Sequence, residues 1–453
     1  MPHPNAETTD TSAKNQQIHP KNVFLKESVG NFRQYIRHTY HSLDRQILVF
    51  SIVMRLPPFM IALATLLLMA HQTGEVTLGA YAAGIVALST ASNHRSYRWL
   101  AQRMGYRLVL LIATTLNIPA VAFLMIQAQQ FKVSGTTGSI AGLLLSSLVA
   151  GLTTAPLGSI MRLFWGRQFI EKDQRGSLIF SSALESILDV IALPAAAAIV
   201  GMVSILGGIQ SSLFAVIVIN VLGIMFMTWK PTALEPIHKG LSDTELPSSE
   251  TPTNTQQFGW FPMLGASFLG IAIGATQSSL VIRAVQTETL ETVGMYLGFM
   301  GAAGALTCLA LVVFFNRFTS WEGWLLISFC LVMSSLTLSL PRSSLGMVVA
   351  LTFFGCAIGA GLMCMDTLVT RLSAQGNVVL AHSSTQSSYI GGLALGYVWA
   401  ALLNTLTGQS AALLVPLVAA TFFFGIGHLF GHLWRKRYEE RLRILKLDEK
   451  SLR

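Results

Sequence analysis

Twelve apolar stretches, each close to the length of a membrane-spanning helix, occupy most of this 453-residue chain. A helix needs roughly 20 mainly apolar residues to cross about 30 Å of hydrocarbon. Hydrophobic residues make up 52% of the sequence and charged residues only 11%, which is far from a soluble domain. The alternating ten-residue strands of a membrane barrel do not occur. We therefore predict an all-α membrane protein.

The predicted spans form two sets of six on either side of one polar segment. Their ends are placed to within about 2 to 4 residues. The approximate bounds are 47–71, 77–95, 107–127, 138–161, 178–203 and 206–229, then 258–282, 292–315, 322–340, 345–370, 381–405 and 410–433.

Five segments follow from this division. Residues 230–257 carry four prolines among Ser, Thr and acidic residues, a composition that cannot bury a core, so we predict a linker. The predicted segments are a tail over 1–46 with a possible interfacial helix, a six-helix bundle over 47–229, the linker, a second six-helix bundle over 258–433, and a basic tail over 434–453.

The basic residues predict the orientation of the chain. With both termini in the cytoplasm, 26 of the 30 Lys and Arg fall on the inner side, only Lys132, Arg283 and Arg342 fall outside, and Arg55 lies within a predicted span. This bias is what the positive-inside rule requires. The net charge of +9 therefore reflects topology and attraction to anionic lipid, and we expect no nucleic-acid partner.

No sequence motif points to catalysis. A phosphate-binding loop, a zinc motif and a nucleophile elbow are all missing from the sequence. The four cysteines all lie in predicted spans without metal-ligand spacing. We expect no enzyme activity and no cofactor or metal.

Four ionisable residues lie within predicted spans: Arg55, Glu185, Asp189 and Asp366. A charge at the centre of a spanning helix costs about 2.5 to 3.5 kcal/mol, so such residues usually face a partner or a water-filled cavity. Glu185 and Asp189 are four residues apart and share one helix face. Repulsion between two close carboxylates favours protonation of one of them. We therefore predict proton coupling at Glu185, Asp189 and Arg55.

A static interpretation of the same residues is also open. Arg55, with or without Arg162, could form a buried ion pair with either acid that fixes helix packing without moving a proton. Asp366 lies near the inner end of its span, where it could pair with Arg371 or face cytoplasmic water.

The second half carries few other charges within its spans, so it is expected mainly to shape a substrate cavity. The predicted cavity residues are Arg55, Gln277, Asp366, Gln386, Tyr389, Tyr397 and Trp399. The aromatic members could instead anchor the helix at the membrane interface. Glycines at 294, 298, 301 and 304 and at 355, 359 and 361 predict closely packed helices.

The loop after the second span carries the most specific motif. Arg98-Trp-Leu-Ala-Gln102-Arg103-Met-Gly105-Tyr-Arg107 resembles Gly-x-Leu-Ala-Asp-Arg-x-Gly-Arg-Arg, found between helices two and three in the major facilitator superfamily. The chain departs from that pattern at Arg98 and Gln102, which stand for the glycine and the aspartate. This resemblance implies twelve transmembrane helices in two pseudo-symmetric six-helix bundles joined by a cytoplasmic linker.

The resemblance also implies a cytoplasmic gate, since the aspartate of that motif belongs to a charge lock that holds the inner side shut. We assign to this gate the motif residues, an eroded second copy, and an inner arginine: Arg98, Gln102, Arg103, Gly105, Arg107, Arg162, Asn316 and Arg317. A further stretch, from Pro156 through Glu185 and Asp189 to Pro194, resembles actinobacterial exporters.

Together these observations predict a secondary transporter that works by alternating access. We expect proton-coupled export of a hydrophobic or amphiphilic small molecule by a monomer in the plasma (inner) membrane. Two alternatives remain. One is proton-linked uptake of a small polar or anionic solute, with Arg55 as a substrate ligand, and the other is a membrane scaffold or sensor that does not transport.

Overall fold

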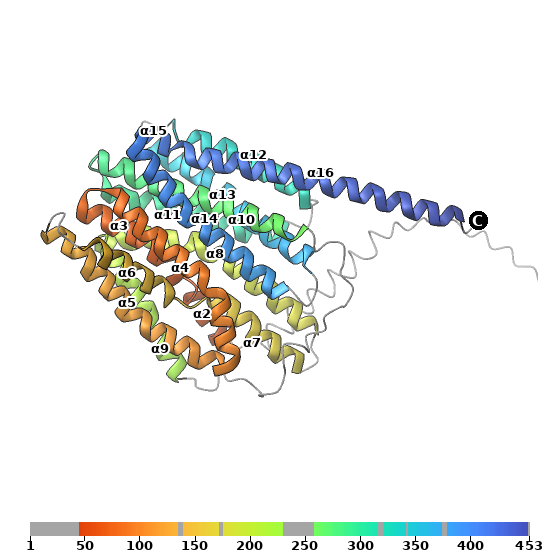
Figure 1. Ribbon diagram of the computed structural model, residues 1–453, viewed down its shortest axis with the longest axis horizontal. Helices are drawn as coiled ribbons and strands as arrows, with labels where there is room; N and C mark the ends of the chain where they lie inside the picture. The colour runs from red at the N-terminus through yellow and green to blue at the C-terminus, as the bar shows by residue number, and fades with distance from the viewer. Residues whose placement is uncertain are drawn as a thin grey trace, which may run out of the picture. The chain divides into compact units, whose positions relative to one another are not determined.

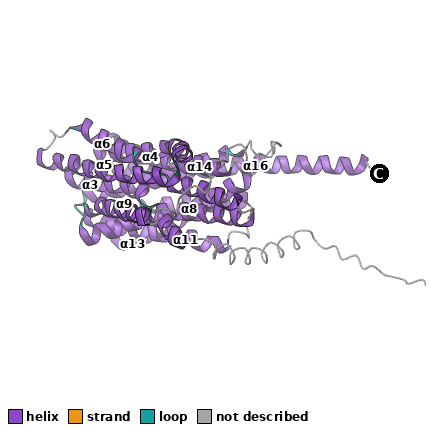
Figure 2. Cartoon of the chain, turned by 90° about the horizontal axis from the view of Figure 1, so that it is seen from below, coloured by secondary structure: helices purple, strands orange, loops and turns teal. Residues whose placement is uncertain are grey.

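Helices account for nearly all of the described chain, as Figures 1 and 2 show. The computed structural model describes residues 45–134, 139–171, 175–229, 258–314, 320–340, 343–373 and 378–451, and these contain no strand. Three predicted features lie outside these residues: the interfacial segment of the N-terminal tail, the linker over 230–257, and the pair Asn316 and Arg317.

Helical segments occur at all twelve predicted spans. Those of the first half are α2 (Arg45–Val53), α3 (Pro57–Thr73), α4 (Val76–Met104), α5 (Tyr106–Ser134), α6 (Ile140–Leu152), α7 (Leu157–Glu171), α8 (Arg175–Gly207) and α9 (Ser211–Trp229). Those of the second half are α10 (Trp260–Gln286), α11 (Leu290–Phe314), α12 (Ser320–Thr337), α13 (Ser344–Leu372), α14 (Val378–Thr407), α15 (Gln409–Ala412) and α16 (Leu414–Ser451).

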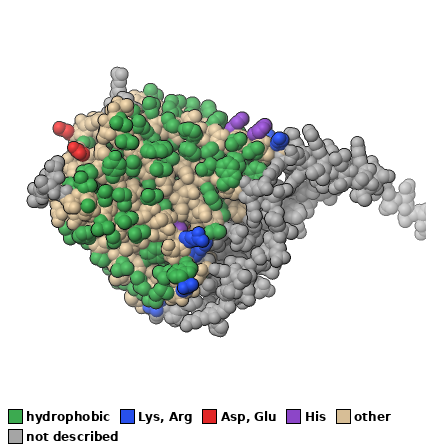
Figure 3. Space-filling model, in the orientation of Figure 1, with side chains coloured by type: hydrophobic (Ala, Val, Ile, Leu, Met, Phe, Trp, Pro, Cys, Tyr) green, Lys and Arg blue, Asp and Glu red, His purple; other side chains and the backbone are tan. Residues whose placement is uncertain are grey.

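Ten helices within the described residues are long and apolar enough to cross a membrane. The two remaining predicted spans are α4, which carries more polar residues, and the shorter apolar stretch Trp321–Thr337. Many large apolar side chains are exposed on the outer helix faces, including Leu116 and Phe214. Figure 3 shows hydrophobic side chains over much of one face. Such a surface suits contact with lipid rather than water.

The helix contacts repeat between the two halves. In the first half α3 packs against α8 and α9, α4 against α6, and α5 against α9. In the second half the corresponding contacts join α10 to α14 and α16, α11 to α13, and α12 to α16. The halves meet where α8 packs against α11 and where α4 packs against α14. The predicted pseudo-symmetry of two six-helix bundles is therefore confirmed.

Two predicted spans are each built from two helices. The first is interrupted at Met54–Leu56, just before Pro57 and Pro58, so Arg55 lies at the break between α2 and α3. The fourth is interrupted between α6 and α7 over residues 153–156. Proline cannot donate a backbone hydrogen bond and disfavours helix in the residue before it, which explains both interruptions.

Buried side-chain amides satisfy the carbonyl groups freed by the second interruption. Asn93 donates through Nδ2 to the carbonyl oxygens of Gly151 and Leu152 at 2.9 and 2.8 Å. Asn117 donates to the Ala150 oxygen at 2.9 Å and accepts from Asn220 at 2.8 Å. A broken helix is tolerated within a bilayer only where its backbone finds partners of this kind.

The tail after residue 433 is not separate from the last span. α16 continues as one helix from Leu414 to Ser451, so the predicted boundary at residue 434 does not coincide with a helix end. Figure 1 draws it as a single dark blue helix.

Glycines allow several helices to approach at backbone distance. A Cβ at Gly201 would overlap the backbone of Gly294 between α8 and α11, and a Cβ at Gly359 would overlap Gly304 between α13 and α11. The predicted close packing at the two glycine clusters is confirmed. At Gly298 the backbone nitrogen lies close to Gly201, while a Cβ of its own would point into open space.

We predict that Gly396→Val destabilises the protein. A Cβ at Gly396 would overlap the backbone of Ile271 and Ala275 on α10, and overpacking of this kind costs about 1 to 3 kcal/mol. The apparent unfolding temperature in detergent should fall. The control is Gly391→Ala on the same helix, where a Cβ meets nothing within 4 Å and no decrease is expected.

Candidate functional site

The break between α2 and α3 places Arg55 against two carboxylates of α8. Arg55 Nε donates to Asp189 Oδ1 at 2.7 Å, and its Nη2 contacts Glu185 Oε2. Its Nη1 donates to the hydroxyl and the carbonyl oxygen of Ser51. All three guanidinium nitrogens of Arg55 are therefore engaged, and the residue is 3% exposed.

A second arginine completes the cluster from α7. Arg162 Nη2 lies 2.6 Å from Asp189 Oδ2, a charge contact whose angles are not those of a hydrogen bond. The remaining Glu185 oxygen accepts from Trp165 Nε1 at 2.9 Å. Two positive and two negative side chains thus neutralise one another within the buried interior. We call Arg55, Arg162, Glu185 and Asp189 the charge cluster.

Gly158 explains how α7 can lie so close to Asp189. A Cβ at this position would overlap both carboxylate oxygens of Asp189. Because α7 and α8 pack together, glycine here leaves room for the acid between the two helices.

Arg162 has unused hydrogen-bonding capacity. Its Nε and Nη1 are buried without a hydrogen-bond partner among the described residues. A buried donor without a partner costs about 1 to 3 kcal/mol and calls for an explanation. Every guanidinium nitrogen of Arg55 already has a partner, so Arg162 is better placed than Arg55 to receive an anion.

A chain of polar contacts links the charge cluster to the second half. Arg162 Nη2 donates to Ser186 Oγ at 3.4 Å, and Ser186 Oγ lies 3.4 Å from His382 Nε2 on α14. His382 Nδ1 lies 2.8 Å from Asp366 Oδ1 on α13, and its Nε2 is 3.2 Å from Thr370 Oγ1. Asp366 thus contacts His382, while its side chain stays 14% exposed.

A second polar contact joins the halves nearby. His94 Nδ1 on α4 lies 3.1 Å from Ser159 Oγ on α7, which lies 2.9 Å from Ser383 Oγ on α14. All three side chains are buried. We call the contacts of Ser186 with His382 and of Ser159 with Ser383 the polar latch, because each one joins α14 to a helix of the first half.

The predicted cavity residues fall into separate groups. Tyr397 donates to Gln277 Oε1 at 2.5 Å, and Gln277 lines a cavity of about 20 Å³ between α8, α10, α11 and α13. That volume is close to the size of one water molecule. Tyr389 stacks on Phe59 with ring centroids 5.9 Å apart, so it joins α14 to α3.

Other predicted positions differ from the expectation. Trp399 is 46% exposed, so it does not line the buried contact between Gln277 and Tyr397 in this structure. Its exposure fits the interfacial alternative for an aromatic side chain. The Tyr389 hydroxyl and Gln386 Oε1 are buried. Neither has a partner at hydrogen-bonding distance and angle among the described residues.

The predicted gate motif covers the last turns of α4, Gly105 and the start of α5, so most of the predicted loop is helical. Gly105 has φ +92°, a conformation that favours glycine, and its N–H donates to the Ala101 carbonyl to end α4. Arg107 donates through Nε to the Met227 carbonyl at 3.0 Å, and Arg103 stacks over Trp99 at 4.0 Å. Arg98 and Gln102 are partly buried in the same segment. Arg162, in contrast, lies in the charge cluster.

Sequence reasoning missed the histidines of this site. His94 and His382 lie near the inner ends of predicted spans, where nothing in the sequence marks them as buried, yet they are 5% and 4% exposed.

Comparison of the structure with solved proteins gives consistent matches. The structure is similar to that of the human organic anion transporter MFSD10 (TETRAN), with TM-score 0.56 and 14% sequence identity, and the match covers 84% of this chain and 99% of that one. The nucleoside transporter NupG matches with TM-score 0.57 and 13% identity over 85% and 98% of the two chains. A POT family transporter in complex with 5-aminolevulinic acid matches with TM-score 0.63 and 13% identity over 86% and 96%.

The chain has the fold of major facilitator superfamily transporters. At these identities the likeness establishes the fold alone. No protein-family profile matches the sequence. No curated protein matches it by sequence either. The resemblance to actinobacterial exporters stays a prediction.

We predict strong coupling between Arg162 and Asp189 in a double-mutant cycle. Arg162→Met leaves two acids with one arginine, and Asp189→Asn leaves one acid with two arginines. Each substitution should therefore lower the free energy of unfolding by about 3 to 5 kcal/mol. The double variant removes one charge of each sign. Its loss of unfolding free energy should be smaller than the sum of the two single losses by about 0.5 to 3 kcal/mol. Unfolding by SDS in mixed micelles measures the three values. Simple additivity would show that the two residues do not form a pair.

Proposed function

We propose that this protein is a secondary transporter of the major facilitator superfamily that uses a proton gradient, with Asp189 as the main proton-binding group. The observation that carries this proposal is the charge cluster, in which Asp189 neutralises two arginines from different helices at once. When Asp189 takes up a proton, the carboxylate loses its charge and both arginines lose a partner. A proton therefore has a direct effect on helix packing.

The polar contacts suggest how this effect could reach the second half. Ser186 directly follows Glu185 and lies about one turn before Asp189 on α8. It contacts both Arg162 and His382. A change in the position of Arg162 would therefore act on the polar latch. Alternating access requires such a connection, because the two bundles must separate on one side when the other side closes.

We further propose that the latched end is the cytoplasmic one. Both latch contacts lie near the start of α14 and at the inner ends assigned by the positive-inside rule. On this assignment the structure corresponds to a state closed toward the cytoplasm, and protonation weakens that closure.

For the substrate, we propose a hydrophobic or amphiphilic molecule that is exported from the cell through the plasma membrane by a monomer. Leu193, Met300 and Ile358 surround Gln277 with apolar side chains, which suit this class once the space of about 20 Å³ widens in another state of the transport cycle.

A second candidate is proton-linked movement of an anionic solute. The Nε and Nη1 of Arg162 favour it, because they have no hydrogen-bond partner among the described residues and a buried guanidinium of this kind suits a carboxylate or phosphate. This candidate assigns the anion to Arg162 rather than to Arg55. The scaffold alternative predicts no transport at all.

We predict that Asp189→Asn abolishes pH-driven transport in reconstituted vesicles. Asparagine keeps the shape of the side chain but cannot exchange a proton, so accumulation driven by a pH gradient should be lost while substrate counterflow without a gradient persists. A panel of amphiphilic and anionic compounds provides the substrates.

The matched control is Glu75→Gln, which neutralises an exposed acid outside the charge cluster and should leave pH-driven transport intact. Unchanged pH-driven transport in Asp189→Asn would refute the assigned role. The triple variant Arg55→Ala, Glu185→Ala and Asp189→Ala tests the scaffold alternative. That alternative predicts that the triple variant complements a deletion strain as fully as the wild-type protein does.

A further inference from the structure

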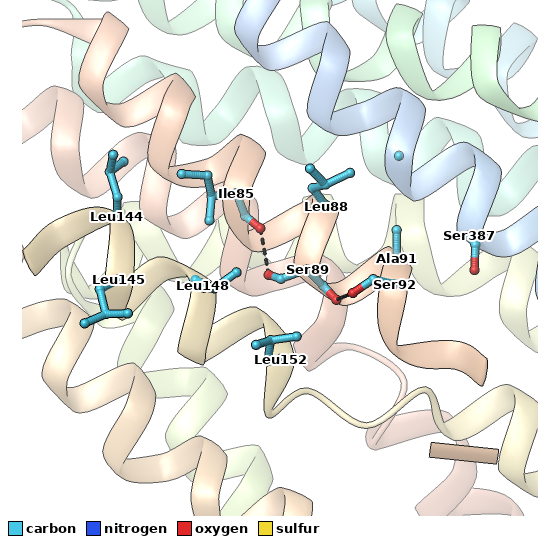
Figure 4. A pocket seen from close by; sticks show the side chains of 11 residues that line it. Ile85, Leu88, Ser89, Ala91, Ser92, Leu144, Leu145, Leu148, Leu152 and Ser387 are labelled. Carbon is cyan, nitrogen blue, oxygen red and sulfur yellow. Dashed lines mark hydrogen bonds between the residues drawn. The ribbon is translucent and has the colours of Figure 1, made fainter. Parts of the chain in front are cut away.

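A large groove lies away from the charge cluster, between α4, α6 and α14. Its volume is about 820 Å³, within the range of sites that hold small molecules. Figure 4 shows its lining side chains, which include Leu88 and Ser92 of α4, Leu145 and Leu152 of α6, and Ser387 of α14. No predicted site residue is among them.

The lining is suited to an apolar group. The Ser89 hydroxyl donates to the Ile85 carbonyl at 2.7 Å, and the Ser92 hydroxyl donates to the Ser89 carbonyl at 2.7 Å, as the dashed lines in Figure 4 show. These hydroxyl donors are thus satisfied within α4. The leucines of α6 form the opposite wall, so the groove offers hydrocarbon contact.

The groove opens sideways and spans both halves. Leu88 is 60% exposed and Leu145 is 56% exposed, although both line it. Helices α4 and α6 belong to the first half, whereas α14 belongs to the second. In a membrane, the opening therefore faces acyl chains at a place where the two halves meet.

One end of the groove leads to the polar latch. Ser383 lies one helical turn before Ser387 on α14, and His94 lies two residues after Ser92 on α4. Arg95 follows Ser92 by three residues, which places it on the same side of α4, and it is exposed. An acidic headgroup at this end would meet a cation while its tail lies among leucines.

We propose that this groove is the lateral entry site for an anionic amphiphile that is dissolved in the membrane, with its tail between α4, α6 and α14 and its headgroup at Arg95. The inference deepens the proposed function, on which it rests, by assigning the substrate class and its route from the bilayer. Movement of α14 against α4 during transport would open or close the site.

Gly391 offers a way to test this site without disturbing the packing. A Cβ at Gly391 meets no atom within 4 Å, so a larger side chain there projects into the groove. Gly391→Phe should therefore fill the site. Gly425→Phe on α16 is the matched control, because a Cβ there also meets nothing within 4 Å and Gly425 does not line the groove. Leu145→Trp narrows the groove from the opposite wall as a second blocking variant.

The probe is a long-chain alkyl sulfonate with a diazirine in its tail, added to the full chain in phosphatidylcholine vesicles. After irradiation, labelled peptides should contain Ile85–Ser92 and Leu144–Leu152. Gly391→Phe should reduce this labelling about tenfold, equivalent to about 1.4 kcal/mol, while Gly425→Phe retains it. Arg95→Gln should reduce labelling by the sulfonate but not by an alkyl glucoside of equal tail length.

Labelling spread evenly over outward helix faces, or unchanged by both blocking variants, would mean that the groove is only a furrow filled by bulk lipid, and would overturn the proposal. A transport arm uses the same sulfonate under a pH gradient. Wild-type protein that labels in the groove but moves no sulfonate refutes the proposed function and leaves the binding site standing. Transport that is equal in wild type and Gly391→Phe refutes the entry site alone.

Discussion

Neutralisation of buried charge is the constraint on which this structure depends. Each ionised side chain in the interior of a bundle loses its hydration and must find opposite charge and hydrogen bonds nearby. Arg55, Arg162, Glu185 and Asp189 meet the charge requirement only as a group, with every carboxylate in contact with an arginine. The hydrogen-bond requirement is met less fully, because two nitrogens of Arg162 have no hydrogen-bond partner among the described residues. A change in the protonation of one acid therefore affects three helices, and this links the chemistry of the site to helix movement.

Broken helices make that group possible. The interruption before Pro57 places Arg55 inside the bundle, and the one before Leu157 starts α7 at a point where Gly158 can lie against Asp189. The carbonyls freed at the second break are satisfied by Asn93 and Asn117. The polar side chains of α4 and α5 thus support the site without touching it, which gives them a role that periodicity alone does not reveal.

Much of the fold could be predicted from sequence, because apolar length is a strong signal in a membrane protein. The pairing of Arg55 with either acid was also accessible, since few charges lie within the spans and the two acids share a helix face, but the contact with both acids at once was not predicted. The partner of Asp366 was not, because His382 comes from a different helix and only the packing of α13 beside α14 brings them together. Trp399 was assigned to the cavity by residue type, yet the rotation of α14 exposes it. The apolar groove could not be predicted, since leucines in a span give no sign of whether they pack or line a gap.

The most direct test measures how the distance between α4 and α14 responds to pH. The protein carries spin labels at Ser96→Cys on α4 and Leu380→Cys on α14, in a variant whose four natural cysteines are replaced. Double electron–electron resonance in nanodiscs then measures the distance between the two labels. If protonation of Asp189 weakens the polar latch, acidification should shift the distribution to longer distances, and Asp189→Asn should show the longer distances at every pH. A distribution that does not change with pH, or a pH response that survives in Asp189→Asn, would contradict the central role of this carboxylate.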